Sequence, residues 1–200
     1  MAYSAAERSS LLRVAHASIA AGLQTGKPLV VNTANYPAPL TGQRASFVTL
    51  TQGGALRGCI GSLEARMMLV EDVAHNAFAA AFRDPRFPPL QQSEFEALDI
   101  QISVLSTPEP VVFATEQELL QGLRPGVDGL ILQENGSRGT FLPSVWESLP
   151  QPGDFLNHLK LKAGLPAGYW SGSVQVWRYT TESFSAPSRL AGGDAGLNAG

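Results

Sequence analysis

Apolar residues recur at helical spacing in two stretches of the first half of the chain, and each stretch predicts an amphipathic helix. The first stretch places four apolar side chains on one face, at steps of three and four residues: Leu12, Ala15, Ile19 and Leu23. Either Gly22 or Gly26 can end this helix in the left-handed conformation. The second stretch covers residues 67–82 and ends near Asp84, because a residue that precedes proline avoids helical backbone angles.

Alternation of apolar and polar residues predicts two β-hairpins and two further strands. The hairpin segments are 46–51 with 55–60 and 129–133 with 137–142. Gly53-Gly54 supplies the first turn, and Asn135-Gly136 is the strongest short-range signal for a two-residue hairpin turn. One alternating segment follows each hairpin: 99–104 and 174–179. Six strands with hairpin connections favour an antiparallel sheet flanked by helices, which is the α+β class.

The two halves of the chain follow the same order of hairpin, helices and strand. Both hairpins also contain an Arg-Gly pair, at Arg57-Gly58 and at Arg138-Gly139. Together these features predict the duplication of a unit of roughly 60 to 80 residues.

A single domain is expected over residues 1–184, because 200 residues permit one domain, or two small lobes around shared secondary structure, but no multi-domain assembly. The duplication predicts two lobes within it, at about 5–110 and 111–184. Residues 185–200 are rich in glycine and alanine, so we expect a flexible C-terminal tail.

Composition narrows the class of protein. Hydrophobic residues make up 44% of the chain and charged residues 16%, against about 25% charged in typical globular proteins. A net charge of −3 without a basic cluster gives no electrostatic footprint for nucleic acid or for an anionic membrane. No apolar run reaches the roughly 18 residues of a membrane span. Cys59 is the single cysteine, which excludes an intrachain disulfide and is typical of a cytoplasmic protein.

Most standard catalytic and cofactor motifs are absent from the sequence. It contains no dinucleotide-binding G-x-G-x-x-G, no Walker sequence, no G-x-S-x-G elbow and no H-E-x-x-H. His16, His75 and His158 are isolated on predicted helices, without a second ligand one turn away. The sequence therefore predicts neither a metal site nor a bound cofactor.

Cys59 is the strongest candidate for chemistry. Strict alternation along the strand would place Arg57, Cys59 and Gly61 on one face, so the guanidinium would neighbour the thiol and favour its thiolate form. Gly58 and Gly61 carry no side chain and would let a ligand or another backbone approach closely. The alternative is that Cys59 packs as a small apolar group, since no general base stands near it in the sequence.

Residues 84–90 form a second dense segment. Asp84 and Arg86 could present an acid and a base to a ligand at the end of the preceding helix. The alternative is a helix stop in which Asp84 and Arg86 form a local ion pair and Phe87 fills the core. Just beyond, Ser93 and Glu96 stand three residues apart, which predicts a capping box for a short helix.

Five segments of the chain resemble, in order, the signature segments of the AMMECR domain family. They are 56–61 (LRGCIG), 84–90, 126–130, 141–143 and 162–165. The resemblance implies a barrel-like, mostly antiparallel sheet built from two similar halves. Tyr169-Trp170 and the preceding Lys-Ala-Gly-Leu-Pro are most similar to bacterial members of the AmmeMemoRadiSam system. In that system the gene accompanies genes for a Memo-like protein and a radical S-adenosylmethionine enzyme.

Two functions are consistent with these features. The first is an accessory component that acts with the Memo-like protein and the radical enzyme, with Asp84 and Arg86 on its binding surface. The second is a thiol-dependent enzyme or carrier in which Arg57 activates Cys59 and a substrate sits beside Gly58 and Gly61. The resemblance implies no catalytic residue, so whether the chain is an enzyme stays open at this point.

Overall fold

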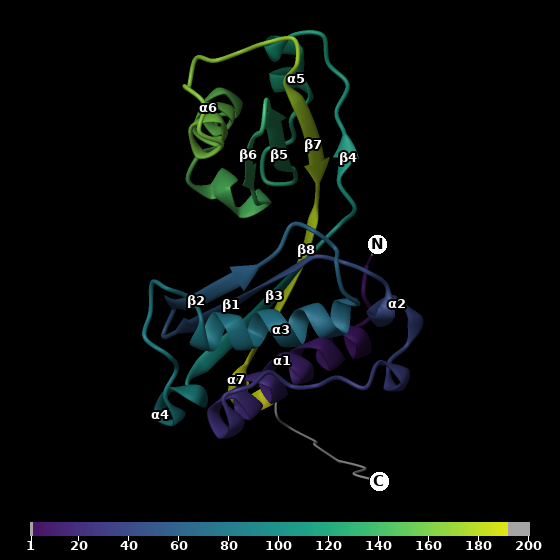
Figure 1. The fold of residues 1–200 in the computed structure, drawn as a ribbon, viewed down its shortest axis with the longest axis vertical. Coiled ribbons are helices and arrows are strands. Elements are labelled where there is room, and N and C mark those ends of the chain that lie inside the picture. Colours follow the sequence, from purple (N-terminus) through teal and green to yellow (C-terminus); the bar gives the residue numbers. More distant parts are fainter. Residues whose placement is uncertain (1, 192–200) are drawn as a thin grey trace. The chain divides into compact units, whose positions relative to one another are not determined.

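The computed structural model describes residues 2–191 of the chain (Figure 1). These residues fall into two compact units. Residues 2–105 and 182–191 make the first unit, and residues 106–181 make the second. Each unit holds its own four-stranded sheet and its own hydrophobic cluster.

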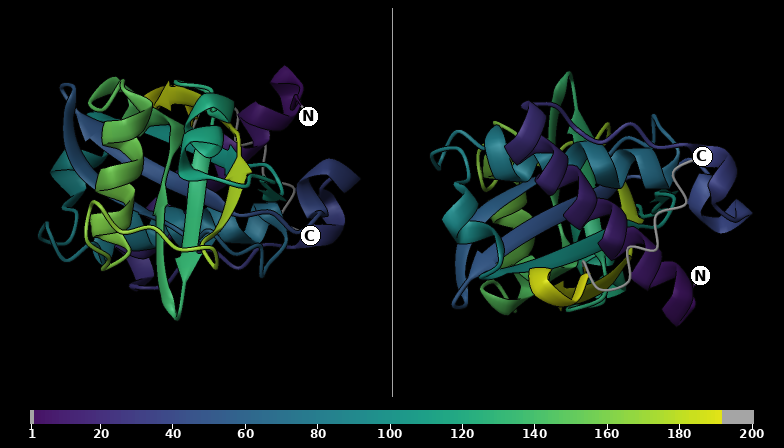
Figure 2. Two further views of the ribbon diagram at one scale, coloured as in Figure 1. Left: turned by 90° about the horizontal axis from the view of Figure 1, so that it is seen from above. Right: turned by 90° about the horizontal axis from the view of Figure 1, so that it is seen from below.

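The first unit contains helices on one side of a sheet with strand order β2-β1-β3-β8. Its elements are α1 (Ala5–Thr25), η1 (Thr33–Asn35), α2 (Ala38–Thr41), β1 (Ser46–Gln52), β2 (Ala55–Gly61), α3 (Leu69–Phe82), α4 (Gln92–Phe95), β3 (Leu98–Leu105), β8 (Thr181–Pro187) and α7 (Ser188–Ala191). Strand β1 pairs antiparallel with both β2 and β3. Figure 2, seen from below, shows α1 and α3 lying across one face of this sheet.

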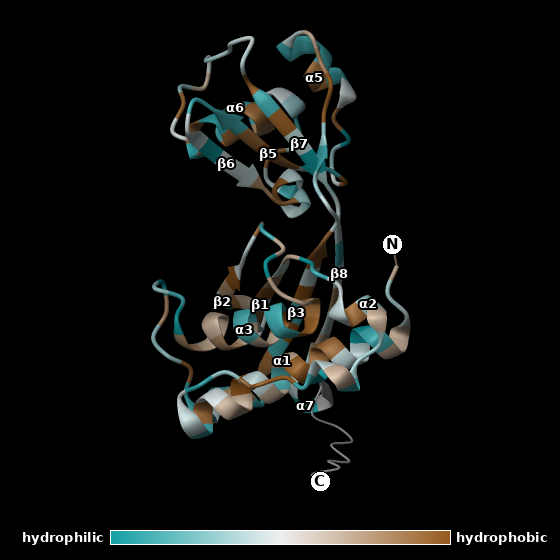
Figure 3. Cartoon of the chain, turned by 45° about the vertical axis from the view of Figure 1, so that its right-hand side comes forward, coloured by the Kyte–Doolittle hydropathy of each residue, from teal (hydrophilic) through white to brown (hydrophobic). Residues whose placement is uncertain are grey.

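The core of the first unit lies between these helices and the sheet. Leu98, Ile100, Ile102 and Val104 alternate along β3 with more exposed residues, so one face of the strand is buried, as the period-two pattern predicts. Helix α1 begins with a capping box at Ser4 and ends at Gly26, which has a left-handed φ of 69°. Figure 3 colours α1 in a mixture of apolar and polar residues, as an amphipathic helix requires.

The second unit has a sheet with strand order β4-β7-β5-β6. Its elements are β4 (Glu109–Pro110), α5 (Glu116–Gly122), β5 (Gly129–Glu134), β6 (Ser137–Phe141), η2 (Pro143–Glu147), α6 (Pro152–Lys162) and β7 (Gln175–Tyr179). Asn135 and Gly136 form the predicted turn, both with positive φ. The core of this unit includes Trp146 stacked on Phe155, with ring centroids 3.8 Å apart.

The two sheets follow one plan, which explains the repeat seen in the sequence. In each, a third strand pairs with the first strand of a hairpin and a fourth strand lies beyond it. Gly58 pairs with Leu50 in the first hairpin, and Gly139 pairs with Leu132 in the second. A β-carbon on either glycine would meet a helix, at Ala80 of α3 or Ala163 at the end of α6. By this register Thr140 is the counterpart of Cys59.

The predicted α+β class with antiparallel strands is confirmed, and the strands lie in two four-stranded sheets, one in each unit. The end of the chain differs from the expected tail. Ser185 lies in β8, and α7 continues to Ala191, because Phe184 and Ala186 pack against the first hydrophobic cluster. Residues 192–200 of the expected tail lie outside the described residues.

Candidate functional site

A β-bulge in strand β2 sets the direction of the candidate side chains. Leu50 pairs with Gly58, but the next residue, Thr51, pairs with Leu56, so Arg57 is the extra residue of β2. A bulge interrupts the alternation of faces and redirects the bulged side chain. The spacing of Arg57 and Cys59 therefore no longer places them side by side on one face.

The guanidinium of Arg57 binds Glu94 rather than the thiol. Its Nε donates to Glu94 Oε1 at 2.7 Å, and its Nη2 donates to Glu94 Oε2 at 3.1 Å and to the carbonyl oxygen of Pro88 at 3.0 Å. Arg57 is only 9% exposed, and the hydrogen bonds from its guanidinium lower the pKa of Glu94 below the ordinary value. The expectation that Arg57 activates Cys59 is not met, because the bulge turns Arg57 toward helix α4.

Glu94 is the partner that sequence reasoning missed. Besides binding Arg57, its carboxylate accepts the backbone N–H of Gln91 at 2.8 Å, and together these residues cap α4. The predicted capping box at Ser93 and Glu96 is thus displaced by two residues. Gln is not among the residues that usually begin a capping box, so the sequence carries no clear signal for Glu94.

Asp84 and Arg86 form a clamp on the backbone of Cys59. Asp84 Oδ2 accepts the Cys59 N–H at 2.9 Å, and Arg86 Nη2 donates to the Cys59 carbonyl oxygen at 3.3 Å. The two side chains also bind each other twice, Arg86 Nε to Oδ1 at 2.9 Å and Nη2 to Oδ2 at 2.6 Å. The Arg86 guanidinium holds the pKa of the buried Asp84 carboxyl well below its usual range.

This clamp occupies the outer edge of the first sheet. Strand β2 is an edge strand, and Cys59 directs its N–H and C=O away from β1 toward Asp84 and Arg86. A neighbouring strand would use the same two backbone groups, one as donor and one as acceptor. The Asp84–Arg86 pair therefore closes the edge at Cys59, which protects it against pairing with another chain.

The thiol of Cys59 is half-buried on the sheet face opposite helices α1 and α3. It lies beside Thr49, whose hydroxyl donates to Sγ at 3.3 Å, and Thr49 is in register with Gln101 of β3. Farther along, the hydroxyls of Ser103 and Ser183 are 2.8 Å apart. Side chains with hydroxyl and amide groups thus share this sheet face with Cys59.

The two glycines of the segment are close to other parts of the first unit. A β-carbon on Gly58 would lie 2.1 Å from the Ala80 carbonyl oxygen, and one on Gly61 would lie 2.3 Å from the Phe47 ring. The sequence predicted that a ligand or another backbone would come close to these glycines. In the structure the neighbouring groups are Ala80 and Phe47 of the same unit. Because the side chain of Gly58 is a single hydrogen atom, α3 can pack directly against β2 at this position.

The structure thus brings Cys59, Asp84 and Arg86 together and directs Arg57 away from the thiol. The three histidines lie elsewhere: His16 beside Phe95, His75 exposed on α3 and His158 on α6. Among residues 2–191, no cluster of three or more histidine, cysteine or acidic side chains has the arrangement of a metal site. No helix in that part of the chain is long and apolar enough to span a bilayer.

Comparison with known proteins agrees with this architecture. A sequence profile of the AMMECR1 family matches residues 12–184. The chain belongs to the AMMECR1 family. That match includes the Cys59 segment, the Asp84–Arg86 clamp and most of β8, so the AMMECR1 domain spans both units.

Relatives of similar length carry the same domain. A protein of Methanothermobacter thermautotrophicus is 34% identical over 89% of this chain and 93% of its own length. Protein MJ0810 of Methanocaldococcus jannaschii is 35% identical over 80% of both chains. The crystal structure of uncharacterized protein PH0010 from Pyrococcus horikoshii, 34% identical, superposes with a TM-score of 0.78 over 88% of this chain and 89% of that one. This AMMECR1-family chain therefore shares its fold with an experimentally determined structure.

Proposed function

We propose that the chain is an accessory protein of the cytoplasm that binds a Memo-like protein and a radical S-adenosylmethionine enzyme and performs no chemistry itself. The similarity to bacterial members of the AmmeMemoRadiSam system supports the identity of these partners. The polar sheet face around Cys59, bordered by the guanidinium of Arg86, is the proposed binding surface.

One observation carries this proposal: the charged side chains around Cys59 form ion pairs with one another. Arg57 and Glu94 bind each other, while Asp84 and Arg86 bind each other and the backbone of Cys59. A nucleophilic thiol needs a base within hydrogen-bond reach or a charge that stabilises the thiolate. Within the described residues, the thiol has a hydroxyl as its hydrogen-bond partner, which cannot serve as a general base. The guanidinium of Arg86 interacts electrostatically with Cys59, but the carboxylate of Asp84 already binds it. This arrangement supports recognition more than catalysis.

Reconstitution of the complex tests the proposal. The tagged chain would be mixed with purified Memo-like protein and radical enzyme from the same genome, and complex formation would be followed by size-exclusion chromatography and biolayer interferometry. Cys59→Ala should leave binding unchanged. Arg86→Ala should weaken binding about tenfold, because arginine side chains at an interface often carry a large share of its free energy.

Arg124→Ala is the matched control for Arg86→Ala. Both arginines have side chains that are 54% exposed, and both bind a buried aspartate, Asp84 or Asp128. Circular dichroism would show that both variants keep their fold. Absence of any complex with either partner protein, or equal loss of binding in both variants, would contradict the proposal.

The alternative is a thiol-dependent enzyme or carrier, and the half-buried position of Cys59 favours it. In that case iodoacetamide at pH 7 should alkylate the native thiol faster than it alkylates the unfolded chain. A native rate equal to or below the unfolded rate would exclude this alternative. Arg57 is not expected to set the rate, since its guanidinium is engaged by Glu94.

A further inference from the structure

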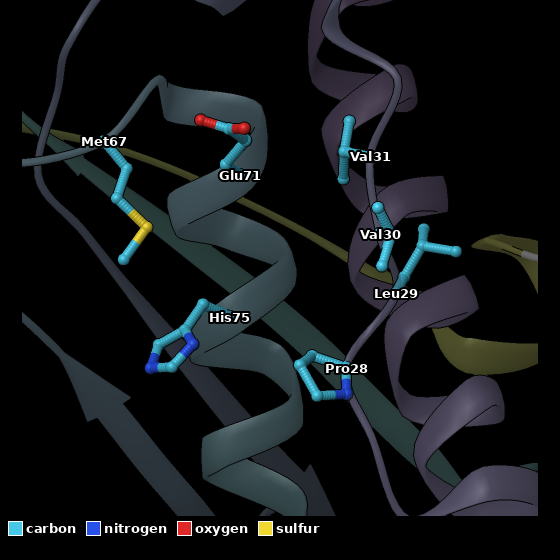
Figure 4. A pocket seen from close by; sticks show the side chains of 7 residues that line it. All are labelled: Pro28, Leu29, Val30, Val31, Met67, Glu71 and His75. Carbon is cyan, nitrogen blue, oxygen red and sulfur yellow. The ribbon is translucent and has the colours of Figure 1, made fainter.

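A small pocket lies in the first unit, away from Cys59 (Figure 4). It has a volume of about 260 Å³. The extended segment 28–31, which follows α1, forms one wall, and Met67 with Glu71 and His75 of α3 forms the other. The pocket is therefore built from two neighbouring parts of the same unit.

Backbone pairing or hydrogen bonds hold both walls in place. The hydroxyl of Ser18, which is fully buried, accepts the N–H of Leu29 at 3.1 Å and donates to the carbonyl oxygen of Ala74 at 2.7 Å. Ser18 thus joins the extended segment to α1 and α3. On the other side, Met68 bridges to Gln43, so the backbone beside Met67 is also paired. A pocket with fixed walls loses little conformational entropy when it binds.

The rim of the pocket exposes apolar surface. Val30 is 93% exposed, and Met67 and its neighbour Met68 are exposed as well. Clustered apolar side chains on a surface often mark an interaction site, and methionine adapts its shape to the group that it contacts. The pocket wall also includes Glu71, an acidic side chain.

Size and charge together define the occupant. A pocket of 260 Å³ is smaller than the roughly 300–1,000 Å³ typical of sites for cofactors and drug-sized ligands. It has room for one large apolar side chain. Two titratable side chains line the wall, Glu71 and His75. When His75 is neutral, the carboxylate of Glu71 would attract a positive charge next to the bound apolar side chain.

We propose that this pocket binds a segment of a partner protein that presents a large apolar side chain beside a lysine or arginine. The apolar side chain contacts Met67 and Val31, and the basic group pairs with Glu71. The proposal rests on the proposed function, because an accessory protein acts through its partners, but it names a surface separate from the Cys59 face.

Methyl NMR gives a direct test on the intact chain. The sequence contains three methionines, so ¹³Cε-methionine labelling yields three signals, assigned with Met67→Leu and Met68→Leu. The probes are the capped tetrapeptides Ac-Gly-Phe-Lys-Gly-NH₂, Ac-Gly-Phe-Glu-Gly-NH₂ and Ac-Gly-Ser-Lys-Gly-NH₂. The Phe-Lys peptide should shift the Met67 signal saturably, and about threefold more tightly than the Phe-Glu peptide, as one exposed ion pair allows. The Ser-Lys peptide should cause no saturable shift.

Matched variants distinguish binding in the pocket from nonspecific binding of the peptides to other apolar surface. Val30→Asp should abolish the titration, whereas Val112→Asp should not, because both valines are 93% exposed but only Val30 lines the pocket. Glu71→Gln should remove the preference for the Phe-Lys over the Phe-Glu peptide, and Glu147→Gln should keep it. A titration unaffected by Val30→Asp, a preference that survives Glu71→Gln, or no saturable shift of Met67 would overturn the proposal.

The same variants distinguish this proposal from the proposed function. If the Memo-like protein or the radical enzyme binds and Val30→Asp weakens that binding, the pocket proposal is supported. If the complex forms equally well with Val30→Asp and Val112→Asp, the pocket proposal is overturned while the proposed function stands. If neither protein binds, the proposed function fails, and the peptide titration alone decides the specificity of the pocket.

Discussion

Asp84 connects the end of helix α3 to strand β2 through a single carboxylate. It is 4% exposed, yet it remains ionised because Arg86 and two backbone N–H groups bind it. A carboxyl with a lowered pKa stabilises the fold at pH values above its unfolded pKa of about 3.9, and this stabilisation is lost as pH falls below that value. Asp72 acts in the opposite sense, since burial raises its pKa.

Replacement of Asp84 by asparagine should therefore lower the free energy of unfolding at pH 7. It should also make that free energy depend less on pH in the acid range. We expect Asp84→Asn to lose about 1.5–3 kcal/mol at pH 7, the range for hydrogen bonds to a charged group. Between pH 7 and pH 3 the variant should lose less stability than the wild type. Urea unfolding at several pH values would measure both effects, and the difference between the two chains cancels the contribution of Asp72.

Asp99→Asn is the control for this experiment, because Asp99 is exposed on β3. It should change stability by less than about 0.5 kcal/mol at either pH, as expected for a surface substitution. Equal behaviour of the Asp84 and Asp99 variants would contradict the role given to the clamp.

Gly58 makes a second prediction at the scale of single residues. Its missing β-carbon would lie 2.1 Å from the Ala80 carbonyl oxygen, which belongs to the backbone of α3 and cannot move alone. Gly58→Ala should cost about 1–3 kcal/mol or more, as overpacking does. In contrast, Gly153→Ala on α6 meets no atom within 4 Å and should be neutral or stabilising by up to about 1 kcal/mol. Thermal unfolding would compare them, and an unchanged midpoint for Gly58→Ala would refute the packing argument.

At the scale of elements, Glu134 holds a loop against the hairpin of the second unit. Its Oε1 accepts the hydroxyls of Tyr169 at 2.8 Å, Ser171 at 2.6 Å and Ser173 at 2.9 Å. These donors, Ser171 foremost, lower the pKa of Glu134. The carboxylate is buried at the end of β5, next to the turn.

Glu134→Gln should loosen this loop without unfolding the unit. The neutral amide accepts weaker hydrogen bonds than a carboxylate, so amide hydrogen exchange over residues 169–173 should become faster. Exchange in α6 should stay as it is. Glu147→Gln, an exposed position in the same unit, provides the comparison, and identical exchange in both variants would show that Glu134 does not hold the loop.

Strands that bury one face, such as β3, were predictable from the alternation of apolar and polar residues in the sequence. The turn at Asn135-Gly136 and the alternation of β3 were both read correctly. The direction of Arg57 was not predictable, because a bulge depends on how two strands pair and leaves no mark in the periodicity of one. The same holds for Glu94, whose role depends on contacts 37 residues apart. Local sequence patterns thus predicted strands and turns, whereas the candidate site depends on contacts between residues that are distant in the sequence.

The arrangement of Asp84 and Arg86 was predicted in part from the sequence. Asp84 and Arg86 were read as either a ligand site or a local ion pair, and the structure has the ion pair. Their hydrogen bonds to Cys59 add a contact that neither alternative contained. Strand β8 was not predicted, for another reason: its composition is poor in β-branched residues, and packing against the first sheet decides its conformation.

At the scale of the whole molecule, the two units have separate hydrophobic clusters and separate natural probes. All three tryptophans lie in the second unit, at positions 146, 170 and 177, and the single cysteine lies in the first. Tryptophan fluorescence therefore reports on one unit and thiol accessibility on the other.

We expect a destabilising change in one unit to affect the probe of that unit first. In Gly58→Ala, Cys59 should become accessible to a thiol reagent at a lower urea concentration, while the tryptophan transition shifts less. Coincident shifts of both probes would instead mean that the two clusters unfold in one cooperative step.

Strand β8 also has a consequence for the order in which the protein can form during synthesis. Residues 106–181 are continuous, so all four strands of the second sheet have been synthesised before residue 182 is added. The first sheet, in contrast, waits for β8, and Glu182 must arrive before Arg8 has its partner. A nascent chain from which residues 1–181 have left the ribosome would thus hold every strand of the later module, whereas the earlier module would still lack its last strand.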